Sequence, residues 1–238
     1  MKQNPSNLIY GRNPVEEAVK NQIVKSIIIS DGFHDNALMA LVKKASIDVR
    51  IVKQSELNQM CPGVNQGIAA IIKPYEYQNM EKILSIAKKQ TNPIIVMLDR
   101  INDPHNFGAI LRCCEIFGVA GVVVGKHDQV PLNQTVAKTS AGAINYVPVA
   151  CVGNLNQTIK SLKDAGFWIV ASSGNADKDY REIKYDFPTV LIIGNEGTGV
   201  SDLVLKNSDF IVKIPMYGKV NSLNASVATG ILLAQIKG

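Results

Sequence analysis

The chain of 238 residues is long enough for one large α/β domain or for two compact ones with separate apolar cores, and two is the better expectation. Apolar residues make up 46% of it and charged residues 19%, and no run approaches the ~20 apolar residues of a membrane helix, which favours a soluble globular protein. The formal net charge of +5 is uneven, because Lys and Arg outnumber Asp and Glu by 12 to 8 over residues 1–90 and by only 13 to 12 over residues 91–238. Such a surplus is compatible with phosphate-backbone binding, and equally with an ordinary solvated surface.

The first part of the chain, residues 8–73, alternates helix-like and strand-like segments. In chain order these are PVEEAVKNQ, IVKSIIIS, HDNALMALVKKA, IDVRIV, SELNQMC and GIAAIIKP. Apolar period and β-branched enrichment predict a small α/β domain here. Pro74 and the polar residues 75–80 end it, and EKILSIAKKQ reads as a helix followed by the break TNP. We therefore predict a domain over 1–75, a linker over 76–92 and a second domain over 93–238.

From Pro93 onward, near-continuous Val, Ile and Leu strands are separated by helices. Such strands indicate a mostly parallel sheet covered on both faces, a doubly wound α/β domain. Ligands of these sheets bind beyond the carboxyl ends of the strands. Three polar, glycine-bearing segments hold that position: DRINDPHN after IIVML, GNEGTG after TVLII, and PMYGKVNS after FIVKI. We expect the three segments to form one site.

The usual motifs of nucleotide-binding and hydrolytic enzymes are absent from the sequence. It contains no G-x-G-x-x-G, no G-x-x-x-x-G-K-[ST] and no G-x-S-x-G, which argues against ordinary dehydrogenases, kinases and α/β-hydrolases. The cysteines form no C-x-x-C pair and the three histidines are scattered, so we expect no metal and buried free thiols rather than disulfides; the cysteines are Cys61, Cys113, Cys114 and Cys151. The start MKQNPSNLIY lacks the apolar stretch of a signal peptide, and we expect a cytoplasmic protein.

Several polar residues in the three segments have a structural reading beside a functional one. Asp103 and Asn106 are both good N-caps at a loop-to-helix start. Arg112 stands in an apolar helix, where a structural ion pair to Asp99 or Glu115 is the plain alternative. Glu196 needs donors or a cation, and either backbone N–H groups or a positively charged ligand satisfy it. Ser222 is a natural N-cap for the closing helix.

Three stretches of this domain carry a family resemblance. DPHNFGAILR (103–112), LIIGNEGTGVS (191–201) and IPMYGKVNSLNASVA (214–228) resemble, in order, the motifs of the SpoU/TrmH branch of the SPOUT methyltransferases, and the similarity spans nearly all of residues 94–236. The N-terminal part, with GRNPVEEAV and VNQGIAAII, is similar to the L30e-like substrate-binding domain of ribosomal RNA guanosine methyltransferases in this family. The resemblance implies a catalytic domain with a trefoil knot, which general rules of chain topology disfavour.

The resemblance also implies an activity: methyl transfer from S-adenosyl-L-methionine to the ribose 2'-hydroxyl of a guanosine in structured RNA, with 23S ribosomal RNA as target. Transfer RNA and a non-catalytic RNA-binding or ribosome-assembly role are the alternatives, and a homodimer is the implied assembly. The catalytic candidates are Asn106, Arg112, Glu196, Ser222 and Asn224. The cofactor-binding candidates are Gly194, Asn195, Gly197, Ile214, Pro215, Met216, Leu223 and Ser226. Arg112 is either the general base or, more easily for a group that keeps its proton, a phosphate anchor.

Overall fold

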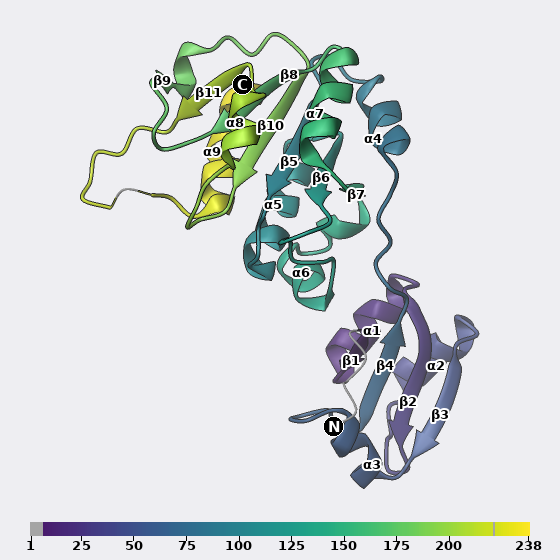
Figure 1. The fold of residues 1–238 in the computed structure, drawn as a ribbon. Coiled ribbons are helices and arrows are strands. Elements are labelled where there is room, and N and C mark those ends of the chain that lie inside the picture. Colours follow the sequence, from purple (N-terminus) through teal and green to yellow (C-terminus); the bar gives the residue numbers. More distant parts are fainter. Residues whose placement is uncertain (1–6, 221) are drawn as a thin grey trace. The chain divides into compact units, whose positions relative to one another are not determined.

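The computed structural model describes residues 7–220 and 222–238 and divides the chain into two compact units, Met1–Tyr75 and Glu76–Gly238, shown in Figure 1. Each unit has its own sheet. Residues 76–92, expected as a linker, contain the helix α4 (Met80–Ala87), whose Ile83 and Ala87 are buried in the core of the second unit. The apolar spacing of this helix therefore serves packing, and the segment counts with the second unit.

The first unit is a four-stranded mixed sheet with strand order β1-β4-β2-β3. Its strands are β1 (Leu8–Tyr10), β2 (Val24–Ser30), β3 (Asp48–Val52) and β4 (Ile68–Ile72), and its helices are α1 (Arg12–Lys20), α2 (Asn36–Lys44) and α3 (Gln54–Met60). β4 runs antiparallel to both neighbours, and β2 and β3 are parallel. Alternate residues of β2 face opposite sides: Ile27 and Ile29 pack with α1 and α2, and Ile28 packs with Leu57 of α3. β1 was not predicted, because a strand of three residues is too short to show an alternation of apolar and polar residues.

The second unit is a seven-stranded sheet with order β7-β6-β5-β10-β8-β11-β9, in which every pairing is parallel. Its strands are β5 (Ile94–Asp99), β6 (Gly121–Gly125), β7 (Val149–Val152), β8 (Trp168–Ser172), β9 (Lys178–Asp179), β10 (Thr189–Gly194) and β11 (Phe210–Lys213). Besides α4, its helices are α5 (Pro104–Ile116), α6 (Gln134–Thr139), α7 (Leu155–Asp164), α8 (Asp202–Lys206) and α9 (Ala225–Lys237), with short 3-10 turns at Ala143–Asn145 and Tyr180–Glu182.

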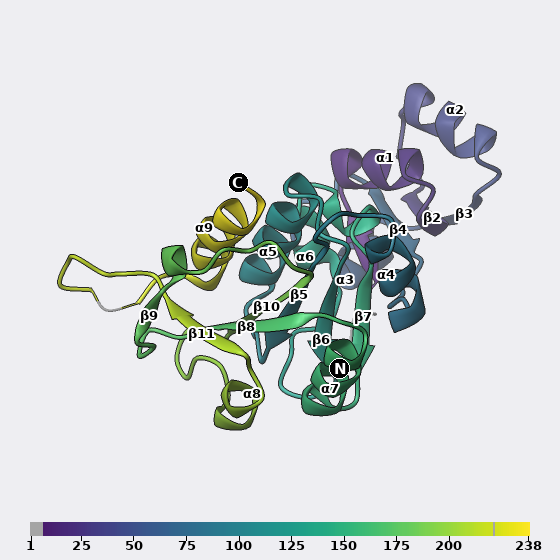
Figure 2. The same ribbon diagram turned by 90° about the horizontal axis from the view of Figure 1, so that it is seen from above.

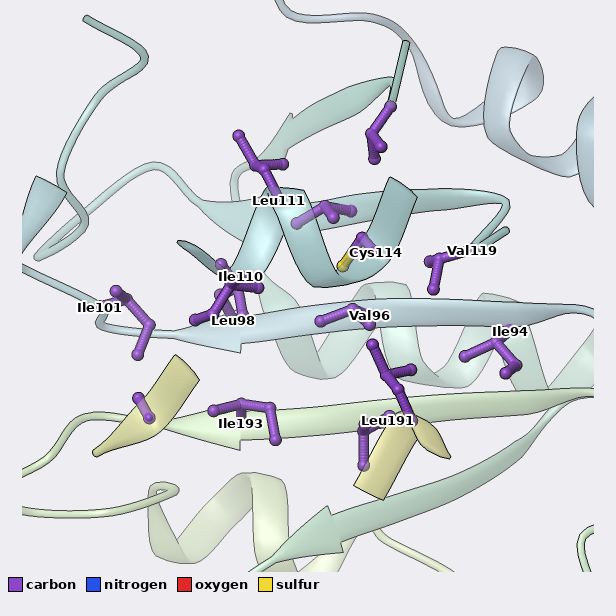
Figure 3. Close-up of a cluster of buried hydrophobic side chains, with 14 of the residues drawn as sticks. Ile94, Val96, Leu98, Ile101, Ile110, Leu111, Cys114, Val119, Leu191 and Ile193 are labelled. Atoms are coloured by element: carbon purple, nitrogen blue, oxygen red, sulfur yellow. The ribbon is translucent and has the colours of Figure 1, made fainter. Parts of the chain in front are cut away.

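Burial on both faces explains the continuous apolar strands. Ile94, Val96 and Leu98 of β5 face the layer of α5, α6 and α9, together with Leu191 and Ile193 of β10 (Figure 3). The intervening residues of the same two strands face the layer of α4, α7 and α8. Figure 2 shows α5, α6 and α9 on one side of this sheet. The predicted fold class, a mixed α/β protein with a mostly parallel sheet, is confirmed.

Three details of this unit differ from the sequence prediction. β7 and β9 were not predicted, since they are only four and two residues long. The closing helix begins at Ala225 and its N-cap is Asn224, so the structural alternative for Ser222, an N-cap, is wrong. Within the described residues no helix is long and apolar enough to cross a membrane. The trefoil knot stays a prediction.

Candidate active site at the carboxyl ends of four strands

A cavity of about 340 Å³ lies at the carboxyl ends of neighbouring parallel strands. The chain runs from β5 to β6 and β7 on one side of the sheet and continues through β8 and β11 on the other, with β10 between β5 and β8. Such a reversal of strand order opens a crevice in which ligands of parallel sheets bind. The cavity is lined by residues that follow β8, β10 and β11 and by the first turn of α9.

A chain of hydrogen bonds beside this cavity joins one residue from each of the motif stretches 103–112, 191–201 and 214–228. Asn224 Nδ2 donates to Asn106 Oδ1 over 2.7 Å, and Asn106 Nδ2 donates to Glu196 Oε1. Asn106 is 8% exposed and lies in the first turn of α5, where Asp103, not Asn106, is the N-cap. The N-cap alternative for Asn106 is therefore wrong, and its side chain meets two residues that lie 90 and 118 positions further along the chain.

The backbone at the start of α9 sets the direction of this chain. Asn224 Oδ1 accepts from the N–H groups of Ser226 and Val227, so its Nδ2 is the end that faces Asn106. Asn106 must then present its oxygen to Asn224 and its Nδ2 to Glu196. Glu196 makes no other hydrogen bond among residues 7–220 and 222–238, and its second oxygen is left for a ligand.

The GNEG loop is shaped by Asn195 rather than by Glu196. Asn195 Oδ1 accepts from the N–H groups of Gly197 and Thr198, and its Nδ2 donates to the carbonyl of Arg100. Of the two readings of Glu196, the one in which it satisfies backbone N–H groups is wrong. Gly194 has no room for a side chain, because a Cβ would lie 2.2 Å from backbone atoms of Gly199 and Val200.

Asp99 and Arg100 tie this loop to the end of β5. Asp99 is 3% exposed, accepts from Ser201 N–H over 2.7 Å and pairs with the neighbouring Arg100, 3.1 Å away. Arg100 adopts a left-handed backbone with φ of 64° and donates to the carbonyl of Gly199. Gly194 lies opposite Asp99 in the register of β10 on β5, so both ends of the loop are held at one place in the sheet.

Most of the predicted site residues lie at the cavity or are joined to it. The residues that line it are Gly194, Asn195, Glu196, Gly197, Ile214, Met216, Ser222 and Leu223. Asn106 and Asn224 are joined to Glu196 by hydrogen bonds. Pro215 and Ser226 are not among the lining residues, and Ser226 Oγ donates to Asn224 Oδ1 instead.

Arg112 stands apart from this group. It is exposed on α5 and makes no ion pair within the described part of the chain, so the structural alternative, a pair with Asp99 or Glu115, is wrong. Its positive charge opposes the effect of burial, which raises the pKa of the neighbouring Cys113 thiol. A free guanidinium on a helix surface is suited to contacting a phosphate.

The sequence analysis missed the segment Ser172–Asn175, which also lines the cavity. A signal was present, since SSGN is a fourth polar, glycine-bearing strand end, directly after β8. Its relevance depends on strand order: β8 lies between β10 and β11 in the sheet, which chain order does not reveal.

Comparison with known proteins assigns a family to this arrangement. Residues 93–234 match the model of the "SpoU rRNA Methylase family", and residues 8–78 match a model described as "RNA 2'-O ribose methyltransferase substrate binding". The chain belongs to the SpoU rRNA methylase family. The resemblance seen in the sequence is thereby confirmed.

Relatives and solved structures agree with this assignment. A "Putative TrmH family tRNA/rRNA methyltransferase" of Staphylococcus epidermidis is 42% identical over 96% of this chain and 94% of its own length. The SpoU methyltransferase AviRb from Streptomyces viridochromogenes, solved in complex with AdoMet, shares the fold at 21% identity with a TM-score of 0.77, over 96% of this chain and 88% of its own. A TrmH/SpoU tRNA modifying enzyme from A. aeolicus is 34% identical with a TM-score of 0.57, over 66% of this chain and 80% of its own.

Proposed function

We propose that this protein transfers a methyl group from S-adenosyl-L-methionine to a ribose 2'-hydroxyl in structured RNA, with a guanosine of 23S ribosomal RNA as the first target to test. The observation that carries the proposal is the hydrogen-bonded chain from Asn224 through Asn106 to Glu196 beside a cavity at the strand ends. The match of residues 8–78 to a substrate-binding model for ribose methyltransferases supports the choice of ribose.

The cavity suits the cofactor in size and chemistry. Its volume of about 340 Å³ falls in the range of small-molecule sites, roughly 300–1,000 Å³. Ile214, Met216 and Leu223 offer apolar side chains to a flat adenine, and Ala225 and Ala228 leave space at the start of α9. When bound, S-adenosyl-L-methionine supplies an electrophilic methyl group on a positively charged sulfur. The carboxylate of Glu196 at the cavity wall is compatible with that charge.

Glu196 and the two asparagines act on the attacking group. A ribose hydroxyl is a weak nucleophile and needs orientation and help in losing its proton. Asn106 holds one oxygen of Glu196, and the other accepts the hydrogen bond of the hydroxyl and orients it. Asn224 keeps Asn106 in the required orientation, because its own amide is set by the helix backbone.

Arg112 acts as a phosphate anchor in this proposal, because it is exposed and free of an ion pair among the described residues. We expect Arg112→Ala to raise KM for RNA and to leave binding of S-adenosylhomocysteine unchanged, since the arginine does not line the cavity. Steady-state kinetics of methyl incorporation, with calorimetry on the same variant, checks this. Unchanged methyl transfer by Arg112→Ala would overturn the role.

The test of the function itself incubates the protein with methyl-labelled cofactor and total RNA, followed by nuclease mapping. Label in a 2'-O-methylguanosine of 23S ribosomal RNA is the expected result, and label in transfer RNA establishes the alternative target. Calorimetry with S-adenosylhomocysteine provides an independent readout. If no binding occurs at high micromolar concentration, the protein is a non-catalytic RNA-binding or ribosome-assembly factor. The hydrogen-bonded residues Asn224, Asn106 and Glu196 argue against that role, since a protein that has lost the activity does not need to keep them.

The proposed assembly is a homodimer working in the cytoplasm. Supporting the dimer, the neighbouring helices α5 and α9 carry large exposed apolar side chains, Ile116 (65% exposed) and Val227 (48% exposed). Exposed apolar groups on adjoining helices are common at protein interfaces.

A further inference from the structure

The first unit has a cavity of its own, with a volume of about 380 Å³. It lies where the start of α1, the end of β2 and the turn before β4 come together, and no predicted site residue belongs to it. Its lining combines the ring of Phe33, the imidazole of His34, one guanidinium, one carboxylate, two side-chain amides and one hydroxyl. The volume again falls within the range of small-molecule sites, roughly 300–1,000 Å³.

One wall brings a guanidinium and an aromatic ring together. The guanidinium of Arg12 lies 5.4 Å from the centre of the Phe33 ring, within the distance of a cation–π contact. The guanidinium also donates to the carbonyl of His34 and lies 3.6 Å from Asp35, which hold it in place. With its side chain 45% exposed, Arg12 offers its outer face to a ligand. Guanidinium planes and aromatic rings are the surfaces on which unpaired bases stack.

The other walls offer hydrogen-bonding groups whose orientation is settled. Gln66 Oε1 accepts from the backbone N–H of Arg12 over 2.8 Å, so its Nε2 is left as a donor. Gln54 Nε2 donates to Asn58 and Asn65, so its Oε1 is left as an acceptor. Ser30 lines the cavity, and its hydroxyl makes no hydrogen bond among residues 7–220 and 222–238, so it is open to solvent or to a ligand at the cavity wall.

The loop that carries Gln66 is held by hydrogen bonds of Asn65. Asn65 is 4% exposed and uses its side chain on Asn58, on the carbonyl of Cys61 and on the N–H of Gly67. Gln66 and Gly67 both have positive φ, 53° and 76°, and a side chain at Gly67 would lie 2.8 Å from Ser30 Oγ. A strained turn held by a buried polar network is typical of a binding site rather than of a plain connection.

Charge decides between a phosphate and a base as the ligand. Arg12 is the one Lys or Arg side chain in the lining and is already paired with Asp35, while Asp31 adds a carboxylate to the cavity. A phosphate would meet little net positive charge there. A flat neutral ring with donors and acceptors on its edge meets a stacking surface, the amides of Gln54 and Gln66, and the Ser30 hydroxyl.

We propose that this cavity binds one unpaired nucleobase of the substrate RNA, stacked on the Arg12 guanidinium and read at its edge by Gln54, Gln66 and Ser30. The inference rests on the RNA methyltransferase function proposed above and adds where the first unit takes hold of an unpaired nucleotide.

The experiment uses the full chain and two fluorescent probes, a short oligoadenylate and an abasic strand with the same sugar-phosphate backbone. Fluorescence anisotropy measures both dissociation constants. We expect the abasic strand to bind on the order of 10-fold more weakly, since base stacking is worth about 1–3 kcal/mol per base. Equal binding of the two strands overturns the proposal and leaves a phosphate or a protein segment as the ligand of this surface.

Two variants test whether the nucleobase binds at Arg12 and Phe33. Arg12→Lys keeps the charge and removes the plane, and we expect it to weaken oligoadenylate binding by roughly 5- to 10-fold without changing binding of the abasic strand. Arg50→Lys is the matched control, because Arg50 is an exposed, ion-paired arginine of the same unit outside the cavity. Phe33→Leu, checked for folding by thermal unfolding, is expected to act like Arg12→Lys. If both variants bind oligoadenylate as the parent does, the cavity is not the site.

Two further readouts separate this inference from the proposed function. Calorimetry with S-adenosylhomocysteine and methyl transfer to total RNA report on the second unit. A parent chain that fails both overturns the proposed function. A parent chain that passes both, with Arg12→Lys methylating RNA at parental KM, overturns only the nucleobase site.

Discussion

At the scale of single residues, the site depends on amides whose orientation is inherited from the backbone. Asn224 accepts from two helix N–H groups, and this sets Asn106 and through it the partner of Glu196. Asn224 caps α9 and also orients Asn106, and residue type alone could not show that one side chain has both tasks.

Replacing Asn224 by an aspartate separates its two tasks. The carboxylate still caps α9, since Asp and Asn are comparable N-caps, so we expect the melting temperature to change by less than about 2 °C. The second oxygen of the introduced carboxylate now faces Asn106 Oδ1, and two acceptors repel each other. Turning the Asn106 amide round to donate to that carboxylate would place its Oδ1 against Glu196. We expect methyl transfer to fall by at least roughly 10-fold.

The matched control is Asn154→Asp, at the asparagine N-cap of α7, where Asn154 Oδ1 accepts from Gln157 N–H and makes no hydrogen bond to a predicted site residue within the described part of the chain. It is expected to keep both stability and activity. Parental activity in Asn224→Asp would remove the joined residues from the catalytic proposal.

Gly194 gives a second prediction at this scale. A Cβ there would lie 2.2 Å from the backbone of Gly199 and Val200, and backbone cannot move aside as a flexible side chain can. We expect Gly194→Ala to cost about 1–3 kcal/mol or more in unfolding free energy and to abolish binding of S-adenosylhomocysteine. Gly153→Ala is the control, because nothing lies within 4 Å of its Cβ position. Denaturant titration and calorimetry of both variants decide the matter.

At the scale of elements, the sequence predicted the long strands and helices of the second unit but not their order in the sheet. Buried runs such as Ile94–Asp99 are apolar on both faces and identify parallel strands. Order depends on contacts between distant segments, which no local pattern encodes. The omission of Ser172–Asn175 from the predicted site has this cause. Glu196 and Asn106 were predicted as site residues, but their bond to each other follows only from the fold.

Asp99, which joins the end of β5 to the GNEG loop, gives the prediction at the scale of elements. An amide at position 99 could still accept from Ser201 N–H, but its NH₂ group would then face the guanidinium of Arg100. We expect Asp99→Asn to lower the unfolding free energy by about 1.5–3 kcal/mol, the range for hydrogen bonds to charged groups, and to weaken binding of S-adenosylhomocysteine.

Asp186→Asn is the comparison for Asp99→Asn. It removes an exposed carboxylate from its ion pair with Lys184, and we expect no measurable change, because exposed pairs add little to stability. If the two variants change the unfolding free energy and the binding of S-adenosylhomocysteine equally, Asp99 does not support the GNEG loop.

At the scale of the whole molecule, the four cysteines report on the packing of both units. Cys61 and Cys114 are buried as expected, Cys113 is half-buried, and Cys151 is exposed, which the sequence did not predict. Burial raises the pKa of the Cys61, Cys113 and Cys114 thiols, so less thiolate forms at a given pH. We expect iodoacetamide near pH 8 to add a single label, at Cys151, and four labels in denaturant. Early labelling of Cys114, read by mass spectrometry, would contradict the packing of α5.

The proposed dimer gives the last prediction at this scale. A twofold interface uses the same patch on both subunits, so one substitution is present twice in it. Ile116 is 65% exposed on α5, and an aspartate there would bury two unpaired carboxylates in an interface built on α5 and α9. We expect sedimentation velocity to give twice 25.8 kDa for the parent chain and 25.8 kDa for Ile116→Asp at micromolar concentration. Leu203→Asp is the control: Leu203 is 59% exposed on α8, in the helix layer on the opposite face of the sheet, and this variant is expected to stay dimeric. A monomeric parent chain would overturn the proposed dimer. A dimeric Ile116→Asp would exclude α5 as its interface.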